Sequence, residues 1–204
     1  MVMFIQIYII LISIIKLFFY MLISENISLL VKSILDNKVV AIPTETVFGL
    51  SCRINTEVIS KIVELKSRSF TKGFILLGSS WDHISPYINE EQLPQEVFEK
   101  KDIYSEPTTW IVPASNKAIS VLTGGRKTIA VRITRNSFLQ NVCDKINQGI
   151  ITTSANMSGE SPAISDMEVC KYFPKGVDFV YKKTIINPLD PSRIVDIITG
   201  QFYR

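Results

Sequence analysis

Short apolar segments of strand length alternate along the chain with segments whose apolar residues recur at helical spacing. The strand-like segments span residues 39–42, 74–77, 110–112, 128–132, 150–153, 177–181 and 194–197. The helical segments span residues 27–35, 56–66, 138–146 and 165–173. A chain of this kind buries its apolar surfaces by packing helices on the faces of a mixed sheet, and such sheets twist. The sequence therefore predicts an α/β fold with a twisted mixed sheet and helices on its faces.

Residues that satisfy free backbone N–H groups mark where the helices begin. We expect the polar cluster 24–26 to cap the first helix and Thr56 to cap the second. Ser165, followed three residues later by Glu168, forms a capping box at the start of the last helix.

Composition and charge describe one ordinary globular domain, which we place at residues 24–204. The net charge is 22 − 19 = +3, which is too weak for a protein that coats nucleic acid but compatible with anionic small substrates. Three cysteines without a Cys-x-x-Cys pair give no support to a disulfide framework or a thiolate zinc site, and they fit a reducing compartment. With His83 as the only histidine, a His-rich metal site is excluded and Ser-His or Cys-His hydrolase chemistry is disfavoured.

Residues 1–23 form an apolar N-terminal extension that is long enough to cross a hydrocarbon layer of ~30 Å as a helix. The extension contains no Gly or Ala, the small residues that membrane helices use for packing. Two hypotheses lead: a mis-assigned start, with Met21 as the true start, or a membrane segment. A signal peptide is a third, although no basic n-region is present. Both leading hypotheses place the rest of the chain in the cytoplasm. If the extension is a membrane anchor, Lys32 and Lys38 follow it and would keep the rest of the chain on the cytoplasmic side.

Four polar clusters occur near the ends of the predicted strands and of the second helix, and ligand crevices in open α/β sheets lie at strand ends. The clusters are residues 43–50, 66–72, 128–132 and 152–159. In the last of them, six of eight residues carry a hydroxyl or an amide or are glycine. Hydroxyls and backbone N–H groups of this kind can hold phosphate oxygens, and a simple polar turn is the alternative.

Cationic residues in these clusters indicate an anion site. Lys66, Arg68 and Lys72 lie within seven residues and repel one another unless an anion is near. Interaction with the C-terminal dipole of the helix is the alternative. Arg132 ends an apolar strand, and its planar guanidinium suits a carboxylate, with a structural salt bridge as the alternative. We interpret residues 124–128 as a turn, since they lead into a strand and not into a helix.

In this order, the clusters resemble the motifs of the YrdC/TsaC family of threonylcarbamoyl-AMP synthases. P-T-E-T-V-F-G-L at 43–50 is similar to the opening P-T-E-[TA]-V-[FY]-G-[LV] segment of that family. K-S-R at 66–68 is similar to the family K-x-R, and S-A-N at 154–156 to its S-x-N. The resemblance extends over roughly residues 25–204 and implies a YrdC-like sheet around a large cationic cavity.

The resemblance implies a nucleotidyltransferase that forms L-threonylcarbamoyladenylate and pyrophosphate from L-threonine, bicarbonate and ATP. The product would serve the t6A modification of tRNA next to the anticodon. It would pass to separate tRNA threonylcarbamoyl-transfer proteins, and weak tRNA binding would be compatible with this role. Mg²⁺ would arrive with ATP, because the sequence offers no cage of protein ligands for a metal.

The resemblance also carries residue roles over to this chain. Lys66 and Arg68 would be catalytic, holding bicarbonate and ATP phosphates. The residues expected at ATP are Lys66, Arg68, Lys72, Thr128, Ser154, Asn156 and Arg204. The residues expected at L-threonine are Thr44, Thr46, Arg132 and Thr152, with Arg132 on the carboxylate.

The chain departs from the family pattern in the segment 104–109, which loses a glycine and gains Glu106, and at Ser69, where proline is usual. A non-catalytic module that binds double-stranded RNA through the same basic cavity is the alternative function. Only Phe70 lies among the cations from Lys66 to Lys72, so aromatic side chains that stack on bases are scarce.

Overall fold

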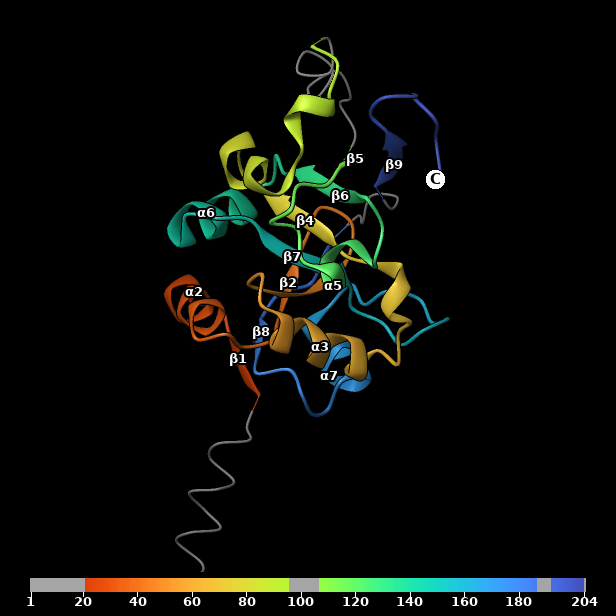
Figure 1. Ribbon diagram of the computed structural model, residues 1–204. Helices are drawn as coiled ribbons and strands as arrows, with labels where there is room; N and C mark the ends of the chain where they lie inside the picture. Colours follow the sequence, from red (N-terminus) through yellow and green to blue (C-terminus); the bar gives the residue numbers. More distant parts are fainter. Residues whose placement is uncertain (1–20, 96–106, 187–191, 204) are drawn as a thin grey trace, which may run out of the picture.

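The computed structural model describes residues 21–95, 107–186 and 192–203, and these form a nine-stranded sheet with helices on both faces (Figure 1). The strands are β1 (Leu22–Ser24), β2 (Val40–Pro43), β3 (Phe48–Cys52), β4 (Ile75–Gly78), β5 (Thr108–Pro113), β6 (Thr128–Ile133), β7 (Ile150–Ser154), β8 (Phe179–Tyr181) and β9 (Arg193–Asp196). The α-helices are α2 (Ile27–Leu35), α3 (Thr56–Leu65), α5 (Ser120–Thr123), α6 (Ser137–Ile146) and α7 (Asp166–Tyr172). Four 3-10 turns are η1 (Phe70–Lys72), η2 (Trp81–His83), η3 (Ser85–Tyr87) and η4 (Glu90–Gln92).

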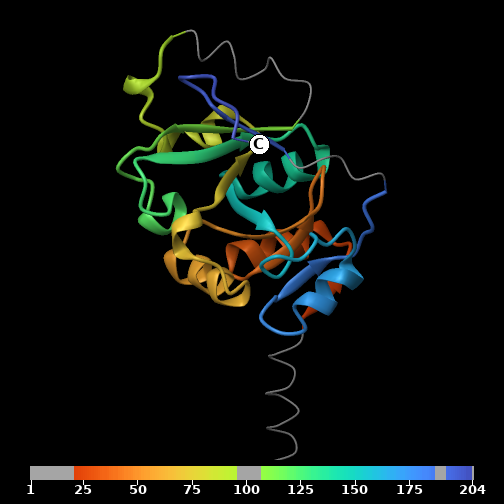
Figure 2. The ribbon, with the colours of Figure 1, turned by 90° about the vertical axis from the view of Figure 1, so that its right-hand side faces the viewer.

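The strand order in the sheet is β1-β8-β2-β3-β7-β4-β6-β5-β9. The pairs β1/β8, β2/β8, β4/β6 and β5/β9 are parallel, and β2/β3, β3/β7, β4/β7 and β5/β6 are antiparallel. The predicted twisted mixed sheet with helices on its faces is thereby confirmed, and Figure 2 shows it from a second side.

Each face of the sheet has its own apolar core. On one face α2 and α6 pack against each other and bury Leu30, Ile34 and Val142. On the other face α3, α5 and α7 contribute to a larger core around Phe48 and Ile62. Neighbouring strand residues alternate between the two cores because successive side chains of a strand point to opposite faces. Figure 1 shows the two helix groups on opposite sides of the sheet.

The structure agrees with the predicted cap of α2 but not with that of α3. Asn26, from the expected cluster 24–26, accepts a hydrogen bond from the Leu29 N–H and caps α2. Thr56 was expected to cap α3, but that expectation is wrong: Asn55 is the cap, and its Oδ1 accepts from two backbone N–H groups. Asparagine outranks threonine at this position, so the helix begins one residue earlier than expected.

The predicted capping box before α7 has the first of its two hydrogen bonds, the one that the cap side chain accepts. Ser165 Oγ accepts from the Glu168 N–H at 3.2 Å. The Glu168 carboxylate reaches back one residue further than the motif requires and accepts from the Ile164 N–H at 2.7 Å.

Two strands were not expected from the sequence. β3 continues directly from the polar segment at 43–47, and β1 lies at the end of the apolar extension 1–23 and pairs in parallel with β8. Residues 1–20 of that extension lie outside the described residues. Within the described ranges, no helix is long and apolar enough to cross a membrane.

Candidate active site

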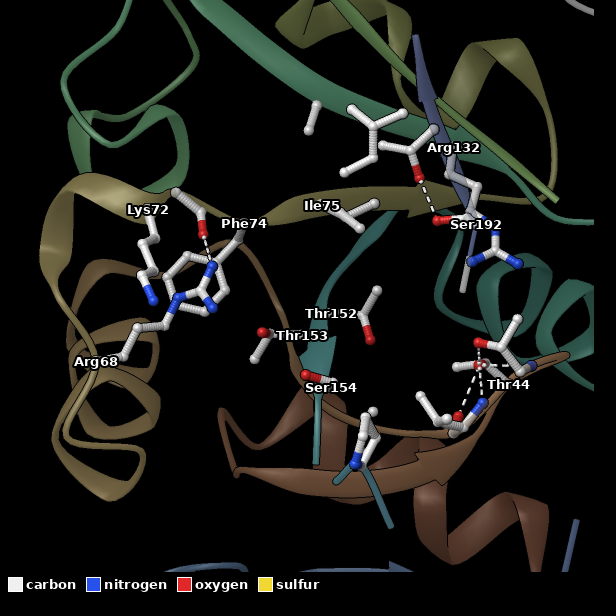
Figure 3. A pocket seen from close by; sticks show the side chains of 18 of the residues that line it. Thr44, Arg68, Lys72, Phe74, Ile75, Arg132, Thr152, Thr153, Ser154 and Ser192 are labelled. Carbon is white, nitrogen blue, oxygen red and sulfur yellow. Dashed lines mark hydrogen bonds between the residues drawn. The ribbon is translucent and has the colours of Figure 1, made fainter. Parts of the chain in front are cut away.

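A cavity of about 380 Å³ opens over the middle of the sheet and is lined from both of its halves. Figure 3 shows Arg68, Lys72 and Phe74 on one side of it and Arg132, Ser192 and Thr44 on the other. The side chains at residues 152–154, from β7, lie between the two sides. Among the described residues that line the cavity there are four cations, Arg68, Lys72, Arg126 and Arg132, and no carboxylate.

Arg68 lies in the cavity wall with part of its donor capacity unused. Its guanidinium donates to the Gly73 carbonyl at 2.9 Å and lies over the Phe74 ring, 5.5 Å from the centroid. The Nε–H is buried and has no hydrogen-bond partner within the described part of the chain. Burial, and secondarily the neighbouring Arg126, lower the pKa of Arg68. A buried N–H donor and a second cation nearby favour an anion at this place.

Arg126 holds the turn that carries Lys72. It donates to the carbonyls of Thr71 at 2.6 Å and Lys72 at 3.1 Å. The chain turns at Gly73 with φ +61°, where a Cβ would press on the Arg126 guanidinium and the Leu122 carbonyl. Lys72 and Arg126 therefore face the same side of the cavity as Arg68.

The end of α3 directs Lys66 and Arg68 to different neighbours. The Ser67 and Arg68 N–H groups donate to the carbonyls of Glu64 and Val63, both at 3.0 Å, which is the pattern of a Schellman ending. Ser67 adopts the left-handed conformation at φ +46° that this ending requires. The reversal of the backbone at Ser67 lets Arg68 face the cavity while Lys66 points into the protein.

Lys66 is 3% exposed and does not line the cavity. Its ammonium donates to the carbonyls of Ser154 at 2.5 Å and Asn156 at 2.6 Å, and to the Asn156 Oδ1 at 2.9 Å. Three protein oxygens therefore use all three of its N–H donors. Burial, and secondarily Arg68 and Lys72, lower its pKa to about 8.

The loop after β7 is held in place by its own polar atoms as well as by Lys66. Ser154 Oγ donates to the Asn156 Oδ1 at 2.7 Å, and the Asn156 amide donates to the Glu160 carbonyl at 2.6 Å. The Ala155 N–H donates to the Phe48 carbonyl at 2.7 Å. Ser154 lines the cavity, whereas Asn156 lies behind it.

Arg132 is in the cavity wall and is also part of a buried salt bridge. Its guanidinium donates to Glu45 Oε2 at 2.6 Å, and Thr134 Oγ1 donates to the other carboxylate oxygen at 2.5 Å. The salt bridge that the sequence left as an alternative for Arg132 is therefore present. Nearby, Thr44 Oγ1 donates to the Val47 carbonyl at 2.7 Å and fixes the turn between β2 and β3.

The structure brings most of the predicted site residues together. Those that line the cavity are Thr44, Thr46, Arg68, Lys72, Arg132, Thr152 and Ser154. Lys66 and Asn156 lie behind the wall and hold Ser154. Thr128 begins β6 on the same face as Ala130 and Arg132 but does not line the cavity. Arg204 lies outside the described residues.

Sequence reasoning missed Arg126, Thr109 and Ser192 in the cavity wall. Arg126 follows Gly124 and Gly125, and the glycine pair was interpreted only as a turn. Thr109 and Ser192 share a hydrogen bond of 3.0 Å between β5 and the start of β9. Both residues reach the cavity through the pairing of β5 with β9, which the sequence alone does not show.

The described residues contain no group of three or more His, Cys, Asp or Glu side chains that could hold a metal ion. The described residues that line the cavity also include no carboxylate, the ligand type that Mg²⁺ prefers.

Comparison with known proteins places this chain in a family. The Sua5_yciO_yrdC family model, described as "Telomere recombination", matches residues 32–204. A threonylcarbamoyl-AMP synthase of Riesia pediculicola is 36% identical over 174 residues, which are 83% of this chain and 91% of that protein. Another, from Vibrio campbellii, is 35% identical over 182 residues, 88% of this chain and 98% of that protein.

The fold agrees with a solved structure described as P. abyssi Sua5 complexed with L-threonine. The TM-score is 0.75 at 23% identity, and the match covers 86% of this chain and 53% of that one. The resemblance inferred from the motifs is thereby confirmed, and the chain belongs to the Sua5/YrdC family.

Proposed function

We propose that this protein is a nucleotidyltransferase that joins L-threonine, bicarbonate and ATP to give L-threonylcarbamoyladenylate and pyrophosphate. The observation that carries the proposal is one cavity with Arg68 and Lys72 on one side, Arg132 and Thr44 on the other, and hydroxyls between, with Arg126 bonded to the turn that carries Lys72. The names of the two synthases and the L-threonine in P. abyssi Sua5 support the choice of substrates. We further propose that the product serves t6A modification next to the anticodon of tRNA through separate transfer proteins in the cytoplasm.

The reaction needs two anions held side by side. The ammonium of L-threonine and bicarbonate give a carbamate with loss of water and a proton. A carbamate oxygen then forms a bond to the α-phosphorus of ATP, and the bond from that phosphorus to the bridging oxygen breaks, releasing pyrophosphate. Fixed cations offset the repulsion between carbamate and triphosphate, and binding both reactants in one cavity removes most of the entropic cost.

The position of each residue in the cavity determines the role that we propose for it. Arg68, Lys72 and Arg126 would hold the triphosphate and take up the charge that develops on the leaving pyrophosphate. Arg132 and the threonine-rich wall would orient the amino acid. Mg²⁺ would enter bound to the ATP phosphates, where it would neutralise part of their charge.

Lys66 supports this arrangement from behind the wall. Its donors are used by the Ser154–Asn156 loop, so we assign it to positioning Ser154 and not to direct contact with the phosphates.

The alternative function, binding of double-stranded RNA, receives little support from the cavity. Its lining aromatic residues are Phe48, which is 0% exposed, and Phe74, which is 4% exposed and lies under Arg68. Neither ring offers a free face on which an unpaired base could stack, and a duplex, which is contacted through its backbone and 2′-hydroxyls, would not enter a concave cavity of about 380 Å³ to reach the cations.

The test is incubation with ATP, bicarbonate and labelled L-threonine, followed by measurement of the adenylate and of pyrophosphate. We expect pyrophosphate release to depend on threonine. Arg68→Ala should lower kcat/KM by about a hundredfold or more, because a fixed charge in the site is lost. Arg53→Ala is the matched control, since Arg53 bonds Gln148 and does not line the cavity. Pyrophosphate release at an equal rate without threonine would contradict the substrate assignment.

A further inference from the structure

Ser51 and Gly49 lie beside Thr152, on the neighbouring strand of the sheet. β3 and β7 run antiparallel, with Ser51 opposite Thr152 and Gly49 opposite Ser154. Thr152 lines the cavity, whereas Ser51 is 0% exposed and does not.

Gly49 gives the Thr152 side chain its room. A Cβ placed at Gly49 would overlap the Thr152 hydroxyl, so no larger residue fits while Thr152 keeps this rotamer. Gly49 has no positive φ, and the need for glycine here comes from this close approach and not from the backbone.

Ser51 sets the direction of the Thr152 hydroxyl proton. Ser51 Oγ donates to Thr152 Oγ1 at 3.1 Å, both atoms being buried. A hydroxyl has a single proton, and accepting from Ser51 turns the proton of Thr152 away from Ser51. In the described part of the chain no protein oxygen accepts it. The remaining direction is the cavity, where Thr152 offers a donor.

A donor at this place selects the chemistry of the group that meets it. A carboxylate, carbamate or hydroxyl oxygen can accept the bond, and an ammonium group, which only donates, cannot. Arg132, also a donor, lies on the adjacent part of the wall.

We propose that Ser51 is a positioning residue for the amino-acid substrate: together with Gly49 it fixes Thr152 so that its hydroxyl donates to an oxygen of L-threonine or of the carbamate formed from it. This role rests on the proposed function. Ser51 acts through Thr152 and touches no substrate itself.

The test is a double-mutant cycle on pyrophosphate release, with Ser51→Ala, Thr152→Val and the two combined. Ser51→Ala should raise the KM for L-threonine about three- to tenfold, the worth of one hydrogen bond, and leave the KM for ATP unchanged. Thr152→Val should raise the KM for L-threonine at least as much. Adding Ser51→Ala to Thr152→Val should change nothing further, because valine has no hydroxyl to direct.

Ser33→Ala is the matched control, since Ser33 is a buried serine on α2 away from the cavity, and its KM for L-threonine should equal that of the wild type. Thermal unfolding of each variant, measured in parallel, separates a change in KM from a loss of fold. An unchanged KM in Ser51→Ala would overturn the positioning role, and so would effects that multiply in the double variant. Absence of threonine-dependent turnover in the wild type would instead overturn the proposed function.

Discussion

Lys66 carries its charge in the protein interior, where it faces three oxygen atoms and two other cations. The Ser154 and Asn156 oxygens surround its ammonium, and Arg68 and Lys72 lie near enough to lower its pKa. A protonated amine offers three N–H donors to these three acceptors, whereas a neutral amine offers two. The loop that carries Ser154 therefore depends on the protonation of a group whose pKa is about 8.

We expect activity to fall as the pH rises through about 8. Deprotonated Lys66 would leave one loop oxygen without a donor, and Ser154 would lose its fixed position. The measurement is the pH profile of kcat/KM for pyrophosphate release. Asn156→Asp should move the descending limb to higher pH, because a carboxylate beside the ammonium favours its charged form. A profile without a descending limb up to pH 9.5 would contradict this role.

Raising the pH has the opposite effect on the contribution of Lys66 to the free energy of unfolding. Its pKa of about 8 in the folded protein lies below the ordinary value of 10.5. Between these two values the unfolded chain binds more protons than the folded one, so this contribution rises with pH. The free energy of unfolding of the wild type minus that of Lys66→Met should therefore increase by about 1–2 kcal/mol between pH 7 and pH 9.5. Denaturant unfolding at the two pH values therefore separates loss of activity from loss of fold.

At this scale the sequence identifies which residues matter more readily than what they contact. The motifs singled out Lys66, Asn156 and Ser154 together, and the structure does connect these three. The sequence could not show which protein atoms surround the Lys66 ammonium, because the Ser154 and Asn156 carbonyls that accept its hydrogen bonds carry no sequence signal. The direction of the side chain follows from the left-handed backbone at Ser67, and serine rarely adopts that conformation.

Among the elements, α3 has the most direct link to the site because Lys66 and Arg68 follow directly after its last turn. Its apolar stripe was predictable from helical periodicity, and Val58, Ile59 and Ile62 are buried as expected. β3 was not predictable in the same way. Its sequence F-G-L-S-C mixes glycine and serine with apolar residues, and it forms a strand because β2 and β7 pair with it on both sides.

The cap of α3 gives a stability prediction at the scale of the element. Asn55→Ala should lower the free energy of unfolding by about 1 kcal/mol, because the N–H groups of Glu57 and Val58 lose their acceptor. Thr56→Ala is the matched control and should have a much smaller effect, since Thr56 is exposed and does not cap the helix. Denaturant unfolding measures both, and a larger loss in Thr56→Ala would assign the cap to Thr56.

For the molecule as a whole, the cavity is a product of long-range pairing. Among the described residues, its cations come from positions 68, 72, 126 and 132, and its hydroxyls from β7, β5, the turn after β2 and Ser192 before β9. The alternation of strands and helices was sufficient to predict a mixed sheet, but strand order is not encoded in periodicity. Thr109 and Ser192 could not be assigned to the site for that reason, since the parallel pairing of β5 with β9 decides where they lie.

The Glu45 salt bridge spans this assembly and links the turn after β2 to β6, 87 residues further along the chain. Glu45→Ala should lower the free energy of unfolding by about 3 kcal/mol, because the buried side chain of Arg132, which is 6% exposed, loses its carboxylate partner. Asp36→Ala, which removes the exposed pair of Lys32 with Asp36, is the matched control and should change stability little. Denaturant unfolding compares the two variants. Equal losses would show that the buried pair does not hold the two halves of the cavity wall together.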